Sequence, residues 1–402
     1  MQKPTLFGYG LTTKAIAKKL GGGCTFFDDR TKETYTDKNN NTIKPSSSFN
    51  PKESSLEVTT PSLPPHHPLI LNAKNLKSEY DYFSDIMPFS IWISGTNGKT
   101  TTTQMLTHIL EKRGAISGGN IGVPLADLDE KASIWVLESS SFTLHHTHIA
   151  SPNIYLLLPI TPDHLDWHKT PKAYEEDKLK PLLTMKEGEL ALIPKGLNIP
   201  QTDAFVVEYD TNKFIQDYFN IESTKLNFKG AFLQDALLAL AINRVLFDEV
   251  DYNLMNNFKL DEHRQEELKD AKNRLWVNDS KATNLDATIQ AVKGYSDAPI
   301  HLIIGGEDKG VDLTPLFESI KTINITLYTI GKNNQKLLNL CKKFNIKSKE
   351  ANTLENAVHL INSVHTSQSI ALLSPASASF DQFTSYKDRG NQFKEFIKNL
   401  KN

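Results

Sequence analysis

The chain has 402 residues, a formal net charge of −2 and only two cysteines, Cys24 and Cys341. A chain of this length exceeds what one ordinary hydrophobic core covers, so we expect two or three domains. Because acidic and basic residues nearly balance, neither nucleic acid nor an anionic membrane surface is an expected partner. The two cysteines are far apart in sequence and match no metal-binding spacing, which indicates a reducing, cytoplasmic compartment.

The sequence also lacks the pattern of a signal peptide at its start. Its longest apolar stretch, around residues 236–242, is too short to cross a bilayer. We therefore expect a soluble, cytoplasmic protein without a membrane partner, and we expect it to be a monomer.

The first segment predicts a nucleotide-binding domain of the Rossmann type. A strand-like run leads into Gly8-x-Gly10 and a helix-like run, and a second strand, CTFF, ends at Asp28. Rossmann-type domains place an acid on a ribose at this point. Thr13 stands where the dinucleotide pattern requires a third glycine, which argues against an NAD site but not against another nucleotide. The alternative is that these glycines only permit close packing of strand and helix.

Residues 91–103, IWISGTNGKTTTT, predict a phosphate-binding loop between a strand and a helix. The standard pattern G-x-x-x-x-G-K-[ST] fails at its first glycine, where the chain has Ile93. The remaining glycines still let backbone N–H groups turn toward phosphate oxygens, and the helix points the positive end of its dipole at them. Lys99 would neutralise the phosphoryl group being transferred, and Thr100 would ligate magnesium. The alternative is a turn with solvated side chains, which the flanking strand and helix disfavour.

Two further strands bring functional groups to the same edge of the predicted sheet. The strand SIWVLESSS ends at Glu138, and NIYLLLPI leads into TPDHLDWH with His164. Carboxyl ends of parallel strands meet at one edge, so Glu138 is expected to hold a magnesium ion that also touches Thr100. His164 beside it suggests a second metal site. Three neighbouring histidines are interpreted as structural: His145, His146 and His148.

These motifs, in this order, resemble the central domain of the ATP-dependent Mur ligase family, which builds the peptide stem of bacterial peptidoglycan. The shared stretches are ISGTNGKTTT, GNIGVPL, LESSSF and TPDHLDWH. The family has the same shortened phosphate loop, so the resemblance accounts for the missing first glycine. Folylpolyglutamate synthases share this central core, and the core by itself does not select a substrate.

The last third of the chain narrows the resemblance to the branch of the family that adds D-glutamate. The stretches that carry it are HRQE, NDSKATN, GGEDKG, LSPASASFDQF and RGNQF. The resemblance implies an ATP-dependent ligase that joins D-glutamate to UDP-N-acetylmuramoyl-L-alanine through an acyl phosphate. A folylpolyglutamate synthase is the rival enzyme, and it should lack NDSKATN. A scaffold protein without turnover is the other rival, and it would have lost some of Lys99, Glu138, His164 and Lys178, which are all present.

The resemblance implies an α/β fold of three domains. These are a Rossmann-like N-terminal domain for the UDP substrate, a central P-loop ATPase-type domain for ATP, and a Rossmann-like C-terminal domain for the amino acid. We place them at residues 1–87, 88–260 and 261–402. Strand-like and helix-like runs alternate along nearly the whole sequence, which independently predicts α/β domains with largely parallel sheets.

The resemblance also implies a role for individual residues. The expected ATP contacts are Gly95, Thr96, Asn97, Gly98, Lys99, Thr100, Thr101, Arg264, Asp279 and Lys281. The expected contacts to the UDP substrate are Leu11, Thr12, Asp28, Arg30, Asn120 and His164. The expected contacts to D-glutamate are Thr283, Lys309, Ser379, Phe380 and Tyr386. The expected magnesium ligands are Thr100, Glu138, His164 and Lys178, and the expected catalytic residues are Lys99, His164, Lys178 and Arg264.

Lys178, in KAYEEDKLKPL, looks from composition alone like a lysine on a helix surface among acids. A protonated lysine has no lone pair and cannot ligate magnesium. In Mur ligases, a lysine at the matching place is carbamylated by CO₂, which turns a cation into a carboxylate-like anion. The resemblance therefore implies a carbamylated Lys178.

One stretch departs from the family pattern. The family has G-x-H-N before the long helix of the central domain, whereas this chain has GAFLQD from Gly230. The polar pair expected near the base or ribose of the nucleotide is lost, and no residue is assigned to adenine recognition.

Overall fold

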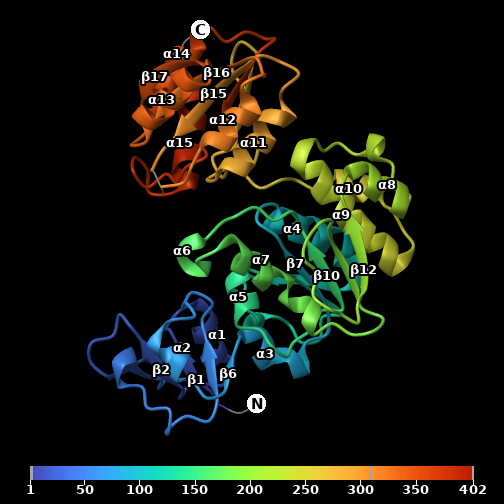
Figure 1. Ribbon diagram of the computed structural model, residues 1–402, viewed down its shortest axis with the longest axis vertical. Helices are drawn as coiled ribbons and strands as arrows, with labels where there is room; N and C mark the ends of the chain where they lie inside the picture. Colours follow the sequence, from blue (N-terminus) through green and yellow to red (C-terminus); the bar gives the residue numbers. More distant parts are fainter. Residues whose placement is uncertain (1–2, 308–309, 401–402) are drawn as a thin grey trace. The chain divides into compact units, whose positions relative to one another are not determined.

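The computed structural model describes residues 3–307 and 310–400, and these residues form three six-stranded sheets with helices against them (Figure 1). The chain divides into two compact units. The first contains the residues up to Leu226 and Asp235–Met255, and the second contains Asn227–Gln234 and the residues from Asn256 onward. The first unit holds two sheets and the second holds one, which confirms the expected α/β fold.

The first sheet has the strand order β3-β4-β2-β1-β5-β6 and is parallel except for the pair β3–β4. Its strands are β1 (Thr5–Phe7), β2 (Thr25–Asp28), β3 (Tyr35–Thr36), β4 (Thr42–Pro45), β5 (Glu57–Thr59) and β6 (Leu76–Lys77). The helices of this part are α1 (Leu11–Lys19), α2 (Pro68–Asn72) and α3 (Glu79–Phe83). Because β2 and β5 flank β1, the loops after all three open at one edge, as in a Rossmann-like domain.

The second sheet has the strand order β12-β11-β10-β7-β9-β8, and all its pairs are parallel. Its strands are β7 (Phe89–Ser94), β8 (Ala115–Gly119), β9 (Ile134–Glu138), β10 (Ile154–Leu157), β11 (Leu190–Pro194) and β12 (Phe205–Tyr209). Its helices are α4 (Lys99–Leu110), α5 (Ser141–His145), α6 (Leu165–His168), α7 (Pro171–Leu179), α8 (Asn212–Phe219), α9 (Gly230–Phe247) and α10 (Tyr252–Asn256). Since β7 lies between β9 and β10, the segments after these three strands share one edge.

The third sheet has the order β13-β14-β18-β15-β16-β17 and is parallel except for β13–β14. Its strands are β13 (Glu266–Lys269), β14 (Leu275–Asn278), β15 (Ile300–Gly305), β16 (Ile325–Ile330), β17 (Lys347–Asn352) and β18 (Ile370–Leu373). Its helices are α11 (Leu285–Gly294), α12 (Thr314–Ile320), α13 (Asn334–Lys343), α14 (Leu354–Asn362) and α15 (Tyr386–Lys398). Leu302 belongs to one core cluster and Ile303 to another, because alternate strand residues face opposite sides of the sheet.

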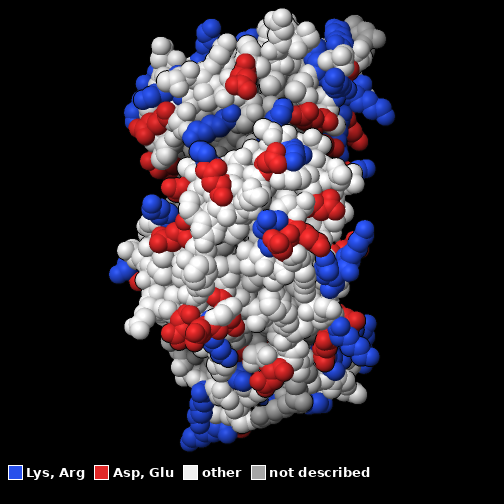
Figure 2. All heavy atoms as spheres, turned by 90° about the vertical axis from the view of Figure 1, so that its right-hand side faces the viewer, with Lys and Arg blue, Asp and Glu red and all other residues white. Residues whose placement is uncertain are grey.

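Helix α9 is longer than the apolar run in the sequence suggested. By length and composition it would suffice to cross a membrane, so the expectation of a stretch too short for a bilayer is wrong as to length. Its residues from Asp235 to Asn243 are all buried within the protein. Burial of this kind is typical of the core helix of a globular domain. The surface drawn in Figure 2 intersperses blue and red side chains, as the balanced charge of the sequence predicts.

Candidate active site at the carboxyl end of the central sheet

The loop between β7 and α4 requires glycine at two positions. Gly95 has φ +139°, and a Cβ there would lie 2.5 Å from Cβ of Leu158. Gly98, directly before α4, has φ +82°, and a Cβ there would lie 2.6 Å from Oδ1 of Asp235. Both conditions exclude a side chain without rearrangement. The strand, tight turn and helix predicted for a phosphate-binding loop are therefore all present.

Glu138 ends β9 beside this loop and is buried. Its Oε2 accepts a hydrogen bond of 2.9 Å from the Thr100 hydroxyl, and its Oε1 accepts one of 2.7 Å from Nδ2 of Asn120. The structure thus brings together three residues that the sequence assigned to metal and substrate binding. A carboxylate next to a hydroxyl supplies the hard oxygen donors that magnesium prefers.

His164 follows β10 and precedes α6 in a left-handed backbone conformation, with φ +53°. Its ring packs edge-on against Phe142 at 4.8 Å, and about half of its side chain is exposed. Partial burial lowers the pKa of His164, although the charge of Asp163 opposes this shift. The two lysines of the site, Lys99 and Lys178, lower it further. A neutral imidazole keeps a lone pair and can bind a metal or accept a hydrogen bond.

Lys178 points into the protein, contrary to what its acidic neighbours in the sequence suggest. It is 1% exposed, and its Nζ donates to the carbonyl oxygen of Gly95 at 2.8 Å and to Oγ of Ser94 at 3.3 Å. The ammonium also lies 4.7 Å from the centre of the Tyr174 ring. Burial lowers the pKa of Lys178 well below its usual range, and the charge of Lys99 adds to the shift. The side chain of Lys178 therefore packs against the loop between β7 and α4 and does not lie on the exposed surface of α7.

At the carboxyl end of the central sheet, acidic and histidine side chains alone do not form a metal site. Within residues 3–307 and 310–400, no three His, Cys, Asp or Glu side chains converge in a way that could hold an ion. Thr100 and Glu138 fit one magnesium ion together with phosphate oxygens. His164 and an unmodified Lys178 do not fit a second, because an ammonium repels a cation.

Four of the residues that are expected to contact the UDP substrate lie in or beside the loops after β1 and β2: Leu11, Thr12, Asp28 and Arg30. Oδ2 of Asp28 accepts a hydrogen bond of 2.7 Å from the backbone N–H of Tyr9, and its Oδ1 accepts one of 2.9 Å from that of Arg30. Asp28 therefore stabilises the turn that contains Gly8 and Gly10. Leu11 and Thr12 begin α1 at the same edge, and Leu11 is exposed.

The expected ATP contacts of the second unit lie just before β13 and just after β14. Asp279 is buried and accepts hydrogen bonds from Oγ of Ser374 at 2.8 Å and from the backbone N–H of Gln265 at 3.3 Å. Burial raises the pKa of Asp279 to about 7. Nζ of Lys281 lies 4.2 Å above the Tyr386 ring, and Nε of Arg264 lies 3.8 Å from Oδ2 of Asp261.

The loops after β15 and β18, which carry most expected D-glutamate contacts, pack against each other. Gly306 makes this approach possible, since a Cβ there would lie 2.2 Å from the carbonyl oxygen of Ala378. Ser379 is buried, whereas 69% of Phe380 is exposed. The expected contact Lys309 lies outside the described residues. The structure thus joins residues 305–307 to the SPASASF segment, and the ligand that they bind stays a prediction.

Arg389 is a residue to which the sequence assigned no role. It is fully buried, and its guanidinium donates to Oγ and the carbonyl oxygen of Ser280 at 2.9 and 2.8 Å and to the carbonyl oxygen of Ser377 at 3.2 Å. It thereby ties the NDSKATN segment to the SPASASF segment. Arg389 is the first residue of the RGNQF stretch, which the sequence analysis used only to identify the family. No local sequence pattern indicates that its side chain is buried.

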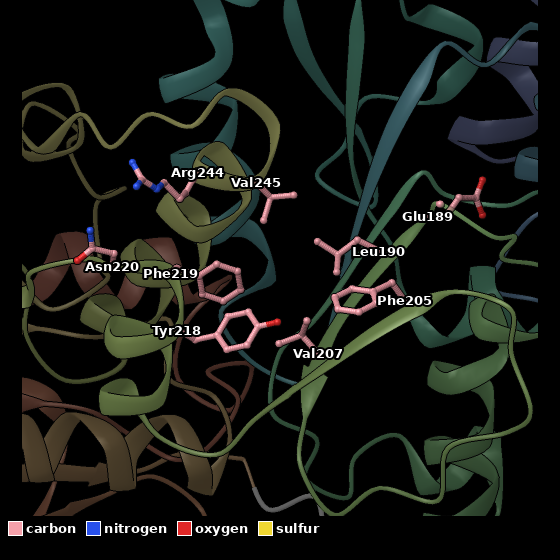
Figure 3. A pocket seen from close by; sticks show the side chains of 10 residues that line it. Glu189, Leu190, Phe205, Val207, Tyr218, Phe219, Asn220, Arg244 and Val245 are labelled. Carbon is pink, nitrogen blue, oxygen red and sulfur yellow. The ribbon is translucent and has the colours of Figure 1, made fainter.

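A separate cavity of about 570 Å³ lies between β11, β12, α8 and α9 (Figure 3). Its walls include Leu190 and Phe205, which are the first residues of their strands. The phosphate loop follows the last residue of β7, so in a parallel sheet the cavity lies toward the opposite edge. None of the expected site residues that the structure describes lines it.

Comparisons with known proteins agree with this geometry. Residues 93–234 match the Mur ligase middle domain. The chain is 50% identical over 401 residues to the UDP-N-acetylmuramoylalanine–D-glutamate ligase of Campylobacter jejuni subsp. jejuni strain 81-176, which covers 99% of this chain and 100% of that protein. It is 45% identical over 418 residues to the ligase of the same name from Helicobacter pylori strain HPAG1, covering 98% of this chain and 99% of the relative.

Solved structures of more distant proteins show the same fold. MurF ligase from Thermotoga maritima in complex with ADP has a TM-score of 0.57 at 14% identity, covering 99% of this chain and 98% of that chain. Folylpolyglutamate synthase from Mycobacterium tuberculosis has a TM-score of 0.52 at 13% identity, covering 80% and 95%. Such low identities speak for the fold alone, whereas the full-length identities of 45–50% decide the family. The chain belongs to the UDP-N-acetylmuramoylalanine–D-glutamate ligases, a branch of the Mur ligase family.

Proposed function

We propose that this chain joins D-glutamate to UDP-N-acetylmuramoyl-L-alanine at the expense of ATP, in the cytoplasmic synthesis of peptidoglycan precursors. The observation that carries the proposal is the full-length identity of 45–50% to ligases of that name. The phosphate loop supports it, because Thr100 and Glu138 are already in contact beside a turn whose two glycines, Gly95 and Gly98, both have positive φ.

The chemistry explains why the reaction needs ATP. An amide does not form spontaneously from a free carboxylate in water, so the γ-phosphoryl group is first transferred to the carboxylate of the L-alanine residue. This gives ADP and an acyl phosphate, which the amine of D-glutamate then attacks with release of phosphate. The loop from Gly95 to Thr101 offers backbone N–H groups and Lys99 to the phosphoryl oxygens as negative charge shifts among them.

Magnesium would be held by Thr100 and Glu138 at one position, and by His164 and a carbamylated Lys178 at a second. When bound, the metal screens the substrate carboxylate from the phosphate that it must approach. Asn120 donates to the other oxygen of Glu138 and so orients the carboxylate. We also assign Asn120 and His164 to the muramoyl-alanine end of the substrate.

The surroundings of Lys178 favour carbamylation. Only a neutral amine attacks CO₂, and burial together with the charge of Lys99 lowers the pKa of Lys178 toward that form. The product is an anion with two oxygens and no longer a cation. A lysine that cannot serve magnesium as it stands thereby becomes a suitable ligand.

The remaining contacts follow the three proposed domains, residues 1–87, 88–260 and 261–402. We assign the UDP moiety to Leu11, Thr12, Asp28 and Arg30. We assign ATP contacts in the third domain to Arg264, Asp279 and Lys281. We assign D-glutamate to Thr283, Lys309, Ser379, Phe380 and Tyr386. A substrate with two carboxylates needs donors at both ends, because an unpaired buried carboxylate is costly.

The test is phosphate release from ATP with UDP-N-acetylmuramoyl-L-alanine and a panel of amino acids. We expect release that depends strongly on D-glutamate and is near background with L-glutamate, D-alanine or L-lysine. A parallel reaction with a reduced folate and L-glutamate tests the folylpolyglutamate synthase alternative. Release that ignores the amino acid, or that requires the folate, would overturn the proposal.

A further inference from the structure

Hydrogen bonds link four side chains that lie close in sequence to the expected metal ligands. We call these four side chains the Asp177 network. Oγ of Ser141 lies 2.9 Å from Nε2 of His168, and Nδ1 of His168 lies 2.9 Å from Oδ2 of Asp177. The other oxygen of Asp177, Oδ1, lies 2.8 Å from Nδ1 of His145. The carboxylate of Asp177 therefore receives one imidazole from the end of α5 and one from the end of α6.

The members of the network sit next to expected metal ligands in sequence. Ser141 follows Glu138 by three residues, His168 follows His164 by four, and Asp177 directly precedes Lys178. The network thus joins the three chain segments that carry those ligands. These segments follow two different strands, β9 and β10, and meet only through tertiary packing.

The network is well placed to hold these segments rigidly. The His168 side chain is fully buried, and 14% of the Asp177 side chain is exposed. Buried polar groups stay in place because leaving one unpaired is costly, so each hydrogen bond fixes its partner. The Phe142 ring adds a second link, since it stacks on His168 at 5.5 Å and meets His164 edge-on at 4.8 Å.

The order Ser141–His168–Asp177 is also that of a serine hydrolase triad, but the burial of Ser141 excludes this role. Only 3% of Ser141 is exposed, so its hydroxyl cannot reach the carbonyl carbon of an ester or peptide substrate. The residue next to the network that contacts the phosphate loop is Lys178, which directly follows Asp177. Lys178 reaches the carbonyl oxygen of Gly95 in the phosphate loop at 2.8 Å.

We propose that Asp177 is a positioning residue: by binding His145 and His168 it fixes the rotation of α7 and thereby aims Lys178 at the phosphate loop. Successive residues of a helix point about 100° apart, so clamping one side chain sets the direction of the next. The helix cannot turn without breaking both imidazole contacts. The expected effect on kcat rests on the proposed function, whereas the positioning of Lys178 by Asp177 does not.

The kinetic test compares Asp177→Asn with Glu176→Gln. Glu176 is an exposed acid on the same helix, paired loosely with Lys172 at 3.7 Å, and serves as the matched control. In asparagine one of the two carboxylate oxygens becomes an NH2 donor, so Asp177→Asn cannot accept from the two imidazoles on separate atoms as Asp177 does. We expect kcat to fall about 10–100-fold in Asp177→Asn, as for other groups that orient a ligand, while KM for ATP stays unchanged. Glu176→Gln should retain the parent kinetics.

A second readout needs neither magnesium nor turnover. The metal-free protein is treated with an amine-acylating reagent, and the labelling of Lys178 relative to the exposed Lys172 is measured by peptide mass spectrometry. Buried Lys178 should be protected in the parent protein and in Glu176→Gln, and should become reactive in Asp177→Asn. This readout tests the position of Lys178 even if the protein proves to use another amino acid.

Loss of stability is controlled with His146→Gln. His146 is buried next to His145, with Nε2 3.0 Å from the carbonyl oxygen of Leu63, and it is not part of the network. Parent kcat and parent labelling of Lys178 in Asp177→Asn would overturn the proposal. A His146→Gln variant that loses as much stability, kcat and Lys178 protection as Asp177→Asn would overturn it as well, because general destabilisation would then account for the effect.

Discussion

Lys99 and Lys178 donate to the same backbone oxygen, the carbonyl of Gly95, at 2.9 and 2.8 Å. Burial lowers the pKa of Lys178, and repulsion between the two ammonium groups, which share one acceptor, lowers it further. The amine is biased toward the neutral form that reacts with CO₂. Carbamylation would then place an anion beside Lys99 and replace repulsion by attraction.

We expect Lys178→Ala to lose activity severely, by about 10²-fold or more, as when other preorganised charged groups are removed from active sites. Short carboxylic acids such as formate or acetate should partly restore kcat, because they can occupy the space of the carbamate. Lys172→Ala, an exposed lysine on the same helix, is the control and should retain activity. Full activity of Lys178→Ala would contradict a carbamate at this position.

Lys99→Ala should abolish turnover and leave the fold intact. The lysine is expected to offset negative charge on the γ-phosphoryl group, and loss of such a group commonly costs about 10²–10³ in kcat. Steady-state phosphate release and circular dichroism measure the two effects. Lys213→Ala, which removes a pair with Asp217 on the surface of α8, should change neither. A Lys99→Ala enzyme with a near-normal rate would show that the loop is not catalytic.

Gly98→Ala should weaken both the fold and nucleotide binding. Gly98 has φ +82°, and an added Cβ would lie 2.6 Å from Oδ1 of Asp235, so strain of about 1–3 kcal/mol is expected. Urea unfolding and titration with a non-hydrolysable ATP analogue measure the two losses. Gly294→Ala is the control, because a Cβ there meets no atom within 4 Å. Equal stability of the two variants would contradict the strain argument.

Asp279 should make the stability of the second unit depend on pH. Burial raises its pKa to about 7 in the folded state, against about 3.9 when unfolded. The folded state therefore holds the proton more tightly, and its stability falls as the pH rises from about 4 through 7. Asp279→Asn cannot ionise at this position. The free energy of unfolding of the variant minus that of the parent protein should therefore increase from about pH 4 to about pH 7 and stay constant above about pH 7. Denaturant unfolding at several pH values measures this difference, and profiles that stay parallel throughout would refute it.

The local structure of the phosphate loop, the α/β class of the fold and the family could all be predicted from the sequence alone. The strand, glycine turn and helix at residues 89–110 follow from hydrophobic runs around Gly95 and Gly98, because backbone conformations that only glycine tolerates are a property of single positions. The order of the motifs identified the family, and the alternation of strands and helices predicted the α/β sheets.

Only the tertiary structure decided which way the polar side chains of α7 face. Lys178 stands among Glu175, Glu176 and Asp177, and these acidic neighbours in the sequence indicate an exposed side chain. Its burial depends on Gly95, which is 83 residues away in sequence, and the direction of Asp177 depends on two histidines from separate helices. The same holds for Arg389, whose partner Ser280 is 109 residues away. Whether a charged side chain is buried depends on such distant contacts, because they supply the hydrogen bonds that offset its desolvation.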